Sequence, residues 1–505
     1  MSRKKLLSII LVGIFAISIL AGCGNSGTAG TSDASTIQNT STAAAGSTQE
    51  PYTVKIVAYG DGSSDASSAV AAELSKQTKK LFNTDIELVK GYTVDQLNLI
   101  LTSGEKLDLF PIMPWELSLA TLAANDQIVA MDDLLKSNGA DTLAAISEND
   151  WKCAQVNGKV YGVPMNKDKA KDTGFAMSKD VADELGIDYK SLTSFDKVEQ
   201  ALLTVKAKKP DIYPFVSSMG QNDLILPYDD LGDSLGVLEN SLDKSTKVVD
   251  LYETDSYKKF VEMMWKWGKE GLIMPDATSN TDGSTTVLGA KKGFGFFAHF
   301  KPGVDNQASA EAGVPIVHST INQPYSTTSM VNAVWSIPAN SEKPERAMQV
   351  LNLLYNDPTA SNTFINGVEG THYVYTDNTK KVIDYPSGKD ANSIGFSVFG
   401  WACPNQQITP VRVGDPTDLW SQLNTYNANA TASPAKGFTW NNAKVLNEVT
   451  ACQNVISKYK NGLELGALNP SEALPKFINE LKAAGIDTIV AEKQSQLDTW
   501  LAAQK

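Results

Sequence analysis

The pattern of apolar and polar positions predicts alternating strands and helices in the first half of the chain. Residues 52–60 form an apolar, β-branched run that is typical of a buried strand, and residues 84–90 form a second one. Between these runs, Val70, Leu74 and Leu81 recur at helical spacing. This alternation predicts an α/β fold with a parallel type of sheet, in which ligands bind beyond the carboxyl ends of the strands.

Further along the chain the same patterns predict a helix over residues 94–101 and a strand over 106–115. We expect that strand to break at Pro111 and Pro114. The second half is richer in helices, and one of them begins at Pro344, because proline suits the first helical position.

Two more helices are expected near the carboxyl end. Residues 445–459 place apolar side chains on one stripe, and Pro470 opens a helix that Gly485 closes at a C-cap position. The order of elements contains no internal repeat.

The amino end carries a basic, then an apolar, then a small-residue segment. Basic residues 3–5 precede the apolar run 6–20, which as a helix is too short to cross a ~30 Å hydrocarbon core comfortably. This order is typical of a signal peptide, which we place at residues 1–22. The Leu-Ala-Gly-Cys string that ends at Cys23 resembles a bacterial lipobox. The resemblance implies cleavage before Cys23 and acylation of its thiol, with palmitate as one of the lipids.

The next segment, residues 23–50, has the composition of a tether. It is rich in Gly, Ser, Thr and Ala and contains no aromatic residue. Such a segment cannot bury enough apolar surface to fold, so we expect a disordered coil of roughly 30 Å r.m.s. length. Two or more lipid chains give stable anchoring. We therefore expect the folded part at the outer face of the cell membrane, attached through the lipid alone.

The remaining part of the chain, about 450 residues, is large enough for two lobes with separate cores. The chain has a net charge of −13, which argues against binding of nucleic acid and against electrostatic binding to a membrane surface. Beyond the signal peptide, Arg346 and Arg412 are the only arginines. Sites for phosphate or carboxylate usually use arginine, so this scarcity argues against a strongly anionic ligand.

Three cysteines remain once Cys23 is acylated. They are Cys153, Cys403 and Cys452, so at most one disulfide can form among them. A bridge between Cys403 and Cys452 is one interpretation. The other is that all three are small apolar residues of the interior.

Few motifs of catalysis or of metal binding occur. His299, His318 and His372 do not lie at metal-ligand spacing, and the sequence lacks a GxSxG elbow, a P-loop and a GxGxxG fingerprint. We therefore expect no cofactor, no metal and no enzyme activity. The plentiful carboxylates leave a glycosidase-like acid/base pair open.

Aromatic residues in polar, loop-like contexts are the candidates for a binding surface. They are Trp115, Trp335 and Trp401, followed by Tyr325 and Tyr373. Sugars present apolar C–H faces rimmed by hydroxyls, which flat aromatic rings and short polar side chains recognise. The alternative for each tryptophan is packing in the core, because large aromatic residues usually bury.

Polar candidates accompany these rings. Asp61 and Ser63 follow the first strand at its carboxyl end, and Glu116 follows Trp115. Asp65 has capping of the next helix as its alternative role. We expect that Ser63 does not cap this helix and is available to a ligand. Glu369 is a further candidate, with a structural turn as its alternative.

Several longer strings resemble one family. The string 156–168 contains Gly-Lys-Val-Tyr-Gly-Val-Pro, and with 175–187 and 335–358 it is similar to the family 1 extracellular solute-binding proteins of ABC importers. The strings 367–375 and 437–441, and others up to residue 501, resemble the long carboxyl-terminal region of a lipoprotein subgroup. Members of that subgroup are described as aldouronate or oligosaccharide binders.

The resemblance implies a type II periplasmic-binding-protein-like fold. Two α/β lobes would hold the ligand in a cleft between them and close about a hinge of two or three crossings. The crossings would lie near residues 168–178, 328–336 and 400. The expected division of the chain is lobe 1 at 51–172, lobe 2 at 173–330, a return to lobe 1 at 331–400, and a carboxyl-terminal region at 401–505 that packs mainly on lobe 2.

The function that follows from the resemblance is capture of a carbohydrate and its delivery to the permease of an ABC importer, by a monomer. An aldouronate carries a carboxylate, and only Arg412 offers a guanidinium away from an apparent surface helix. We therefore expect a neutral oligosaccharide. A surface glycoside hydrolase or lyase, a receptor for peptides or other small solutes, and a structural surface lipoprotein remain as alternatives.

Overall fold

Buried side chains gather in two hydrophobic cores. The first core is drawn from residues 54–165, 333–365 and 396–403, and the second from 175–316 and 435–497. We call the elements packed around the first core lobe 1 and those packed around the second core lobe 2. Neither lobe is continuous in sequence, so the chain must pass from one core to the other more than once.

The structure is a computed structural model that describes residues 49–504 except 61, 218 and 392. The predicted signal peptide, Cys23, nearly all of the predicted tether and Asp61 therefore lie outside the described residues. Within the part that is described, no helix combines the length and the apolar character that crossing a membrane requires.

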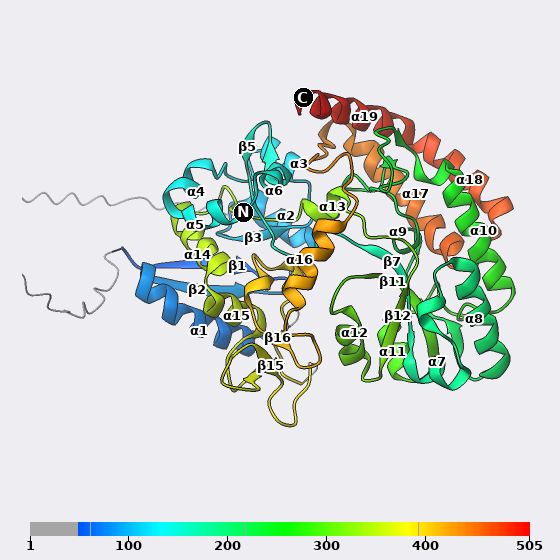
Figure 1. Ribbon diagram of the computed structural model, residues 1–505. Coiled ribbons are helices and arrows are strands. Elements are labelled where there is room, and N and C mark those ends of the chain that lie inside the picture. Colours follow the sequence, from blue (N-terminus) through cyan, green and yellow to red (C-terminus); the bar gives the residue numbers. More distant parts are fainter. Residues whose placement is uncertain (1–48, 61, 218, 392, 505) are drawn as a thin grey trace, which may run out of the picture. The chain divides into compact units, whose positions relative to one another are not determined.

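The elements of lobe 1 are shown at the left of Figure 1. They are β1 (Tyr52–Val57), α1 (Ser64–Phe82), β2 (Thr84–Val89), α2 (Val94–Ser103), β3 (Phe110–Ile112), α3 (Leu119–Ala124), α4 (Asp132–Asn138), α5 (Ala140–Ala145), α6 (Glu148–Trp151), β4 (Gln155–Val156), β5 (Lys159–Val160), β6 (Val163–Pro164), β13 (Val334–Ser336), α14 (Pro344–Asn356) and α15 (Pro358–Asn366).

Lobe 2 contains the following elements: β7 (Asp172–Ser178), α7 (Lys179–Leu185), α8 (Phe195–Lys208), β8 (Tyr213–Phe215), α9 (Asn222–Ile225), β9 (Val237–Leu238), β10 (Val248–Val249), α10 (Asp255–Lys269), α11 (Ser284–Gly289), β11 (Gly293–Phe300), α12 (Val304–Ala312), β12 (Ile316–Thr320), α17 (Leu446–Glu464), α18 (Pro470–Ala484) and α19 (Ile486–Ala503). The remaining elements are α13 (Thr328–Val331), β14 (Val374–Tyr375), β15 (Val382–Asp384), β16 (Val411–Arg412) and α16 (Leu419–Asn429).

Three segments connect the two cores. The first crossing comprises residues 166–174, the second 317–332 and the third 404–434. The first two overlap the segments expected from the sequence. The third begins close to residue 400 but is long, because it contains β16 and α16 before the chain enters the second core.

The sheets are mostly antiparallel or mixed, which corrects the parallel sheet expected from the sequence. β1 and β2 are parallel, and Ile56 continues this arrangement with a parallel bridge to Leu109. In lobe 2, however, β7 lies antiparallel to both β11 and β12, and in lobe 1 β13 lies antiparallel to β3 and β6. The reason is topological: β6 leaves lobe 1 and β13 re-enters it, while β7 enters lobe 2 and β12 leaves it, so the neighbours in each pair run in opposite directions.

Local signals explain most element boundaries. Helix α18 begins at Pro470 and ends with Gly485 in the left-handed conformation, as predicted. The prediction for Pro111 was wrong, because it lies within β3 and pairs with Trp335. β3 is an edge strand of the order β3-β13-β6, where a proline without an N–H is tolerated.

The described cysteines are all free and buried. Cys403 belongs to the first core and Cys452 to the second, so the two residues considered for a disulfide lie in different lobes. Burial raises the pKa of the Cys452 thiol to about 11 and that of Cys153 to about 12. These residues act as apolar side chains of the interior.

Helix α17 carries a buried carboxyl group that titrates near neutral pH. Glu464 is fully buried, and its Oε2 accepts a hydrogen bond from the backbone N–H of Asn222 (3.0 Å) while its Oε1 accepts one from the Tyr257 hydroxyl (3.1 Å). Burial raises the pKa of Glu464 to about 7, from 4.5. In the folded protein the group therefore keeps its proton at pH values where the unfolded chain has lost it.

This difference predicts how the free energy of unfolding of a Glu464→Gln variant depends on pH. The contribution of Glu464 is fully present below pH 4.5 and is lost as the pH rises through 7, by up to about 3 kcal/mol. Glutamine cannot titrate, so the variant should lose less stability between pH 5 and pH 8 in urea denaturation. Exposed Glu472→Gln is the control and should follow the wild type. Equal pH dependence of Glu464→Gln and the wild type would contradict the assignment.

Candidate functional site

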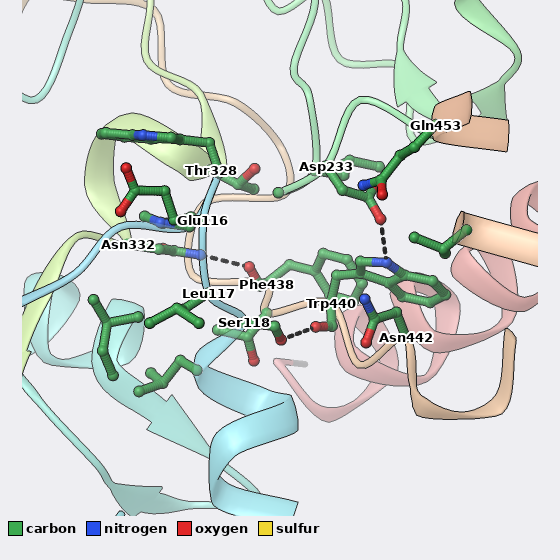
Figure 2. A pocket seen from close by; sticks show the side chains of 18 residues that line it. Glu116, Leu117, Ser118, Asp233, Thr328, Asn332, Phe438, Trp440, Asn442 and Gln453 are labelled. Carbon is green, nitrogen blue, oxygen red and sulfur yellow. Dashed lines mark hydrogen bonds between the residues drawn. The ribbon is translucent and has the colours of Figure 1, made fainter. Parts of the chain in front are cut away.

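A pocket lies where the turn after β3 in lobe 1 meets lobe 2. Its walls come from Trp115 and Glu116 on one side and from Asp233, Trp440 and Gln453 on the other. The space between them, with the solvent at its mouth, is about 680 Å³. Polar and apolar side chains both line it, as in sites for small organic molecules. Figure 2 shows Ser118 joined to the Trp440 backbone and Asp233 joined to its indole, whereas the Glu116 carboxylate points away from both.

Trp115 of the lobe 1 wall belongs to a cluster of four rings, which we call the aromatic cluster. The other three rings, Tyr59, Phe399 and Trp401, lie beside the pocket and do not line it. Trp401 is its centre: its ring centroid lies 6.2 Å from Trp115, 5.9 Å from Tyr59 and 5.7 Å from Phe399. Trp115 is 48% exposed and Phe399 is 38% exposed, so the cluster presents apolar ring surface to solvent.

Two of the tryptophans singled out from the sequence are thus brought together, although 286 positions separate Trp115 and Trp401 in the chain. The sequence analysis did not select Tyr59 or Phe399. The sequence does contain an indication for each of them. Tyr59 lies at the end of the first predicted strand, where ligands bind, and Phe399 stands two residues before the selected Trp401.

Glu116 is held in place beside these rings. The Tyr59 hydroxyl donates a hydrogen bond to its Oε1. Burial, together with this carboxylate, raises the pKa of Tyr59, so the phenol remains a donor at all physiological pH values. The arrangement fixes an acceptor next to exposed aromatic surface, which is the combination that recognises sugar hydroxyls.

The second crossing forms part of the pocket between the two walls. Thr328 and Asn332 line it, and the Asn332 Nδ2 donates to the Phe438 carbonyl oxygen (2.6 Å). The Asn332 Oδ1 is buried and accepts no hydrogen bond from the described residues. Thr328 donates from both its backbone N–H (3.0 Å) and its hydroxyl (2.7 Å) to Asp229 Oδ1, which attaches the crossing to lobe 2.

Three of the predicted aromatic residues offer no surface to a ligand. Trp335 is fully buried in the first core and its indole N–H donates to the Ala402 carbonyl oxygen (3.0 Å). Tyr325 is fully buried beside Lys171, and Tyr373 is buried edge-on against Tyr375. We therefore leave these three out of the site, because their ring faces are occupied by packing.

The remaining polar candidates have structural partners. Ser63 is the N-cap of α1 and its hydroxyl oxygen accepts the Ala66 N–H (3.1 Å), so the expectation that it is free of capping was wrong. Arg412 does not line the pocket. It donates to Asn366 Oδ1 (3.0 Å) and lies over the Tyr385 ring at 4.4 Å.

Arg346 was expected on the surface of its helix, and this prediction was wrong. It is buried and donates to the Thr84 hydroxyl oxygen at 2.7 Å. Both arginines beyond the signal peptide therefore have partners away from the pocket. Among the residues that the structure describes, no group of three or more His, Cys, Asp or Glu side chains is placed to hold a metal ion.

Comparisons with known proteins give a consistent result. A family model described as a domain of unknown function (DUF3502) matches residues 434–502. A protein from Streptococcus pneumoniae serotype 4 named "Carbohydrate ABC transporter substrate-binding protein" is 26% identical over 419 residues, which is 81% of this chain and 82% of that protein.

Solved structures show the same fold. The N-glycan transport solute-binding protein NgtS of Streptococcus pneumoniae matches with a TM-score of 0.78 and 24% identity, covering 90% of this chain and all of that one. In complex with Man1GlcNAc it matches with a TM-score of 0.75, covering 89% and 100%. The alginate-binding protein AlgQ2 matches with a TM-score of 0.62 and 14% identity over 89% and 99% of the two chains. The fold is thus that of the two-domain solute-binding proteins.

The different surroundings of two tryptophans lead to a test. Trp335→Ala should lower the free energy of unfolding by about 3–5 kcal/mol, because it opens a cavity in the first core. Trp115→Ala should change it by only about 0.5 kcal/mol, because nearly half of that ring is already in solvent. Urea denaturation measures both values. Similar losses in the two variants would show that Trp115 is not a free surface ring.

Proposed function

We propose that this chain is an extracellular substrate-binding protein of an ABC importer, which captures an oligosaccharide in the pocket and delivers it to the membrane permease. The observation that carries the proposal is the exposed aromatic cluster beside a carboxylate fixed at Glu116, at the meeting of two lobes. Apolar ring surface together with oriented polar groups suits the two kinds of surface that a sugar presents.

The relatives support this ligand class. One similar protein is named as a carbohydrate transporter component, and NgtS has been solved with Man1GlcNAc and with Man5GlcNAc. All are named as binding proteins. We therefore infer a receptor and not a glycoside hydrolase or lyase.

A neutral glycan fits the pocket better than an acidic one. Glu116 and Asp233 contribute carboxylates to the lining, whereas Arg346 and Arg412 are engaged elsewhere. A uronate carboxylate in this pocket would meet like charges without a guanidinium to neutralise it. We also infer that the receptor acts as a monomer.

Attachment to the membrane forms a second part of the proposal. We infer that the chain is cleaved before Cys23 and acylated there, and that residues 23–50 act as the tether. A receptor tethered in this way stays near its permease at a high effective concentration.

Binding is tested by calorimetry and thermal shift against Man5GlcNAc, Man1GlcNAc, neutral plant and starch oligosaccharides, uronate oligosaccharides and peptides. We expect saturable binding of a neutral member without product formation. Trp115→Ala should weaken that binding about tenfold or more, which corresponds to ~1.4 kcal/mol. The control is Trp265→Ala, which removes a partly exposed ring on α10, outside the pocket. Binding of peptides alone, or glycan cleavage, would contradict the proposal.

Anchoring is tested by membrane fractionation of the producing cells. Cys23→Ala should move the protein from the membrane fraction to the medium, because the thiol that carries the lipid is gone. Cys153→Ala removes a buried thiol and should leave the protein in the membrane fraction. Retention of the Cys23→Ala protein at the membrane would contradict lipid anchoring.

A further inference from the structure

The segment 436–442 lies between the third crossing and helix α17, at the start of the part that matches a domain of unknown function. Its large apolar side chains, Phe438 and Trp440, are buried in the second core. Trp440 and Asn442 also line the pocket. The segment therefore belongs to lobe 2 and borders the pocket where the two lobes meet.

Helix α19 and the loop before β9 fix this segment in lobe 2. The Gln496 Nε2 donates to the Asn441 carbonyl oxygen (2.9 Å) and its Oε1 accepts the Asn441 N–H (3.1 Å), so one side chain holds both backbone groups. The Trp440 indole N–H donates to Asp233 Oδ2 (2.7 Å). Because these partners all belong to lobe 2, the segment has to move with lobe 2 when the lobes separate.

Lobe 1 holds the segment through the first turn of α3. The Ser118 hydroxyl donates to the Trp440 carbonyl oxygen, a bond drawn in Figure 2, and the Thr121 hydroxyl donates to Asn442 Oδ1 (3.1 Å). Helix α3 itself packs into the first core through Leu119. Both hydrogen bonds therefore join the lobes directly, without passing through a crossing.

An ion pair extends this contact to a second helix of lobe 1. The Asp150 Oδ1, on α6, lies 3.3 Å from the Nζ of Lys436, and its Oδ2 lies 2.9 Å from the Nζ of Lys169 in the first crossing. The Ser147 hydroxyl also donates to Oδ2 (2.9 Å), which orients the carboxylate. One carboxylate of lobe 1 thus connects with lobe 2 and with a crossing.

The backbone of the segment reaches lobe 1 at Gly437. This residue has a φ of +95°, in the left-handed region that glycine adopts readily. A Cβ at this position would lie 3.4 Å from the Lys152 carbonyl oxygen of lobe 1 and 3.4 Å from the Trp500 ring of lobe 2. The segment is therefore in contact with both lobes at once.

We propose that the segment 436–442 is a latch, which holds lobe 1 in the closed position and sets how often the pocket opens. When the lobes rotate apart, the latch leaves with lobe 2, so its bonds to Ser118, Thr121 and Asp150 break together. These bonds favour the closed position both with and without a ligand. The inference goes beyond the proposed function, because it holds for any ligand of the pocket.

The test removes two latch bonds and leaves the lining of the pocket unchanged. Thr121→Val removes the donor to Asn442 and keeps a side chain of similar size. Lys436→Met removes the ammonium group that pairs with Asp150. Neither Thr121 nor Lys436 lines the pocket. We call the double variant with both substitutions the latch variant.

The matched control removes the same kinds of bond inside lobe 2. It combines Thr499→Val with Lys458→Met. The Thr499 hydroxyl donates to the Ser495 carbonyl oxygen within α19, and Lys458 pairs with Glu480 between α17 and α18. None of these bonds reaches lobe 1, so the control should change the stability of lobe 2 without changing how often the lobes open.

The ratio of open to closed molecules is measured by single-molecule fluorescence energy transfer on the full chain, without ligand. Dyes are attached to K136C in lobe 1 and K190C in lobe 2, at two exposed positions. The chain also carries C23A, and the described cysteines are buried and remain unlabelled. We expect the ratio to rise about fivefold or more in the latch variant. In the control it should stay within about twofold of the wild type.

The ion pair provides a second readout. Raising the salt concentration from about 10 mM to about 1 M shortens the Debye length from about 30 Å to about 3 Å, which weakens the attraction between Asp150 and Lys436. The single variant Lys436→Met lacks this attraction. Salt should therefore open the wild type more than it opens Lys436→Met.

Two results would overturn the inference. One is a latch variant that opens no more often than the control, and the other is a wild type that responds to salt no more than Lys436→Met. In either case the segment is packed wall and not a latch. Both measurements are made without ligand, so their failure leaves the proposed function standing, and a failed glycan titration leaves the latch standing.

Discussion

Burying two separate cores with one chain requires that the chain cross between them, and each crossing carries polar groups through a poorly solvated region. The first crossing shows how these groups are satisfied. Lys171 is buried and forms a 2.7 Å ion pair with Asp223, and Asp168 is buried and forms one of 2.7 Å with Lys301. The attraction of Lys171 keeps the pKa of Asp223 well below its usual value against the opposing effect of burial. Pairing of this kind makes the crossings possible, and the pocket exists because the crossings hold the two lobes beside each other.

The second crossing connects this polar framework with the pocket. Asp229 and Asp230 are buried neighbours that accept hydrogen bonds from Thr328 and Ser329 at the start of α13. Burial and the adjacent Asp229 raise the pKa of Asp230 to about 6. The same crossing then presents Asn332 to the pocket. A group that lines the pocket thus lies one short helical turn from a buried, protonatable attachment point of the same crossing.

The sequence predicts the order of elements and part of the site, and the differences have physical causes. Trp115 and Trp401 could be selected because they follow strand-like runs in polar surroundings, yet Trp335 has the same local appearance and is fully buried. Which of them packs inside depends on pairing between β13 and β3, a long-range contact that local sequence does not encode. The prediction for Ser63 failed for a different reason. Several residues near a helix start can act as its N-cap, and the backbone geometry, which selects Ser63 for α1, decides among them. The surroundings of Trp440 were beyond local reasoning, since its partners Asp233 and Lys493 lie more than 50 residues away on either side.

The three buried thiols have a consequence for how such a chain reaches its final form. A thiol reacts with oxidants and with other disulfides as the thiolate, and burial suppresses that form in Cys153, Cys403 and Cys452 alike. Once folded, these cysteines are protected from the oxidising surroundings beyond a cell membrane. The described part therefore reaches its folded form without a disulfide, so neither lobe has to wait for a bond to form between cysteines of different cores.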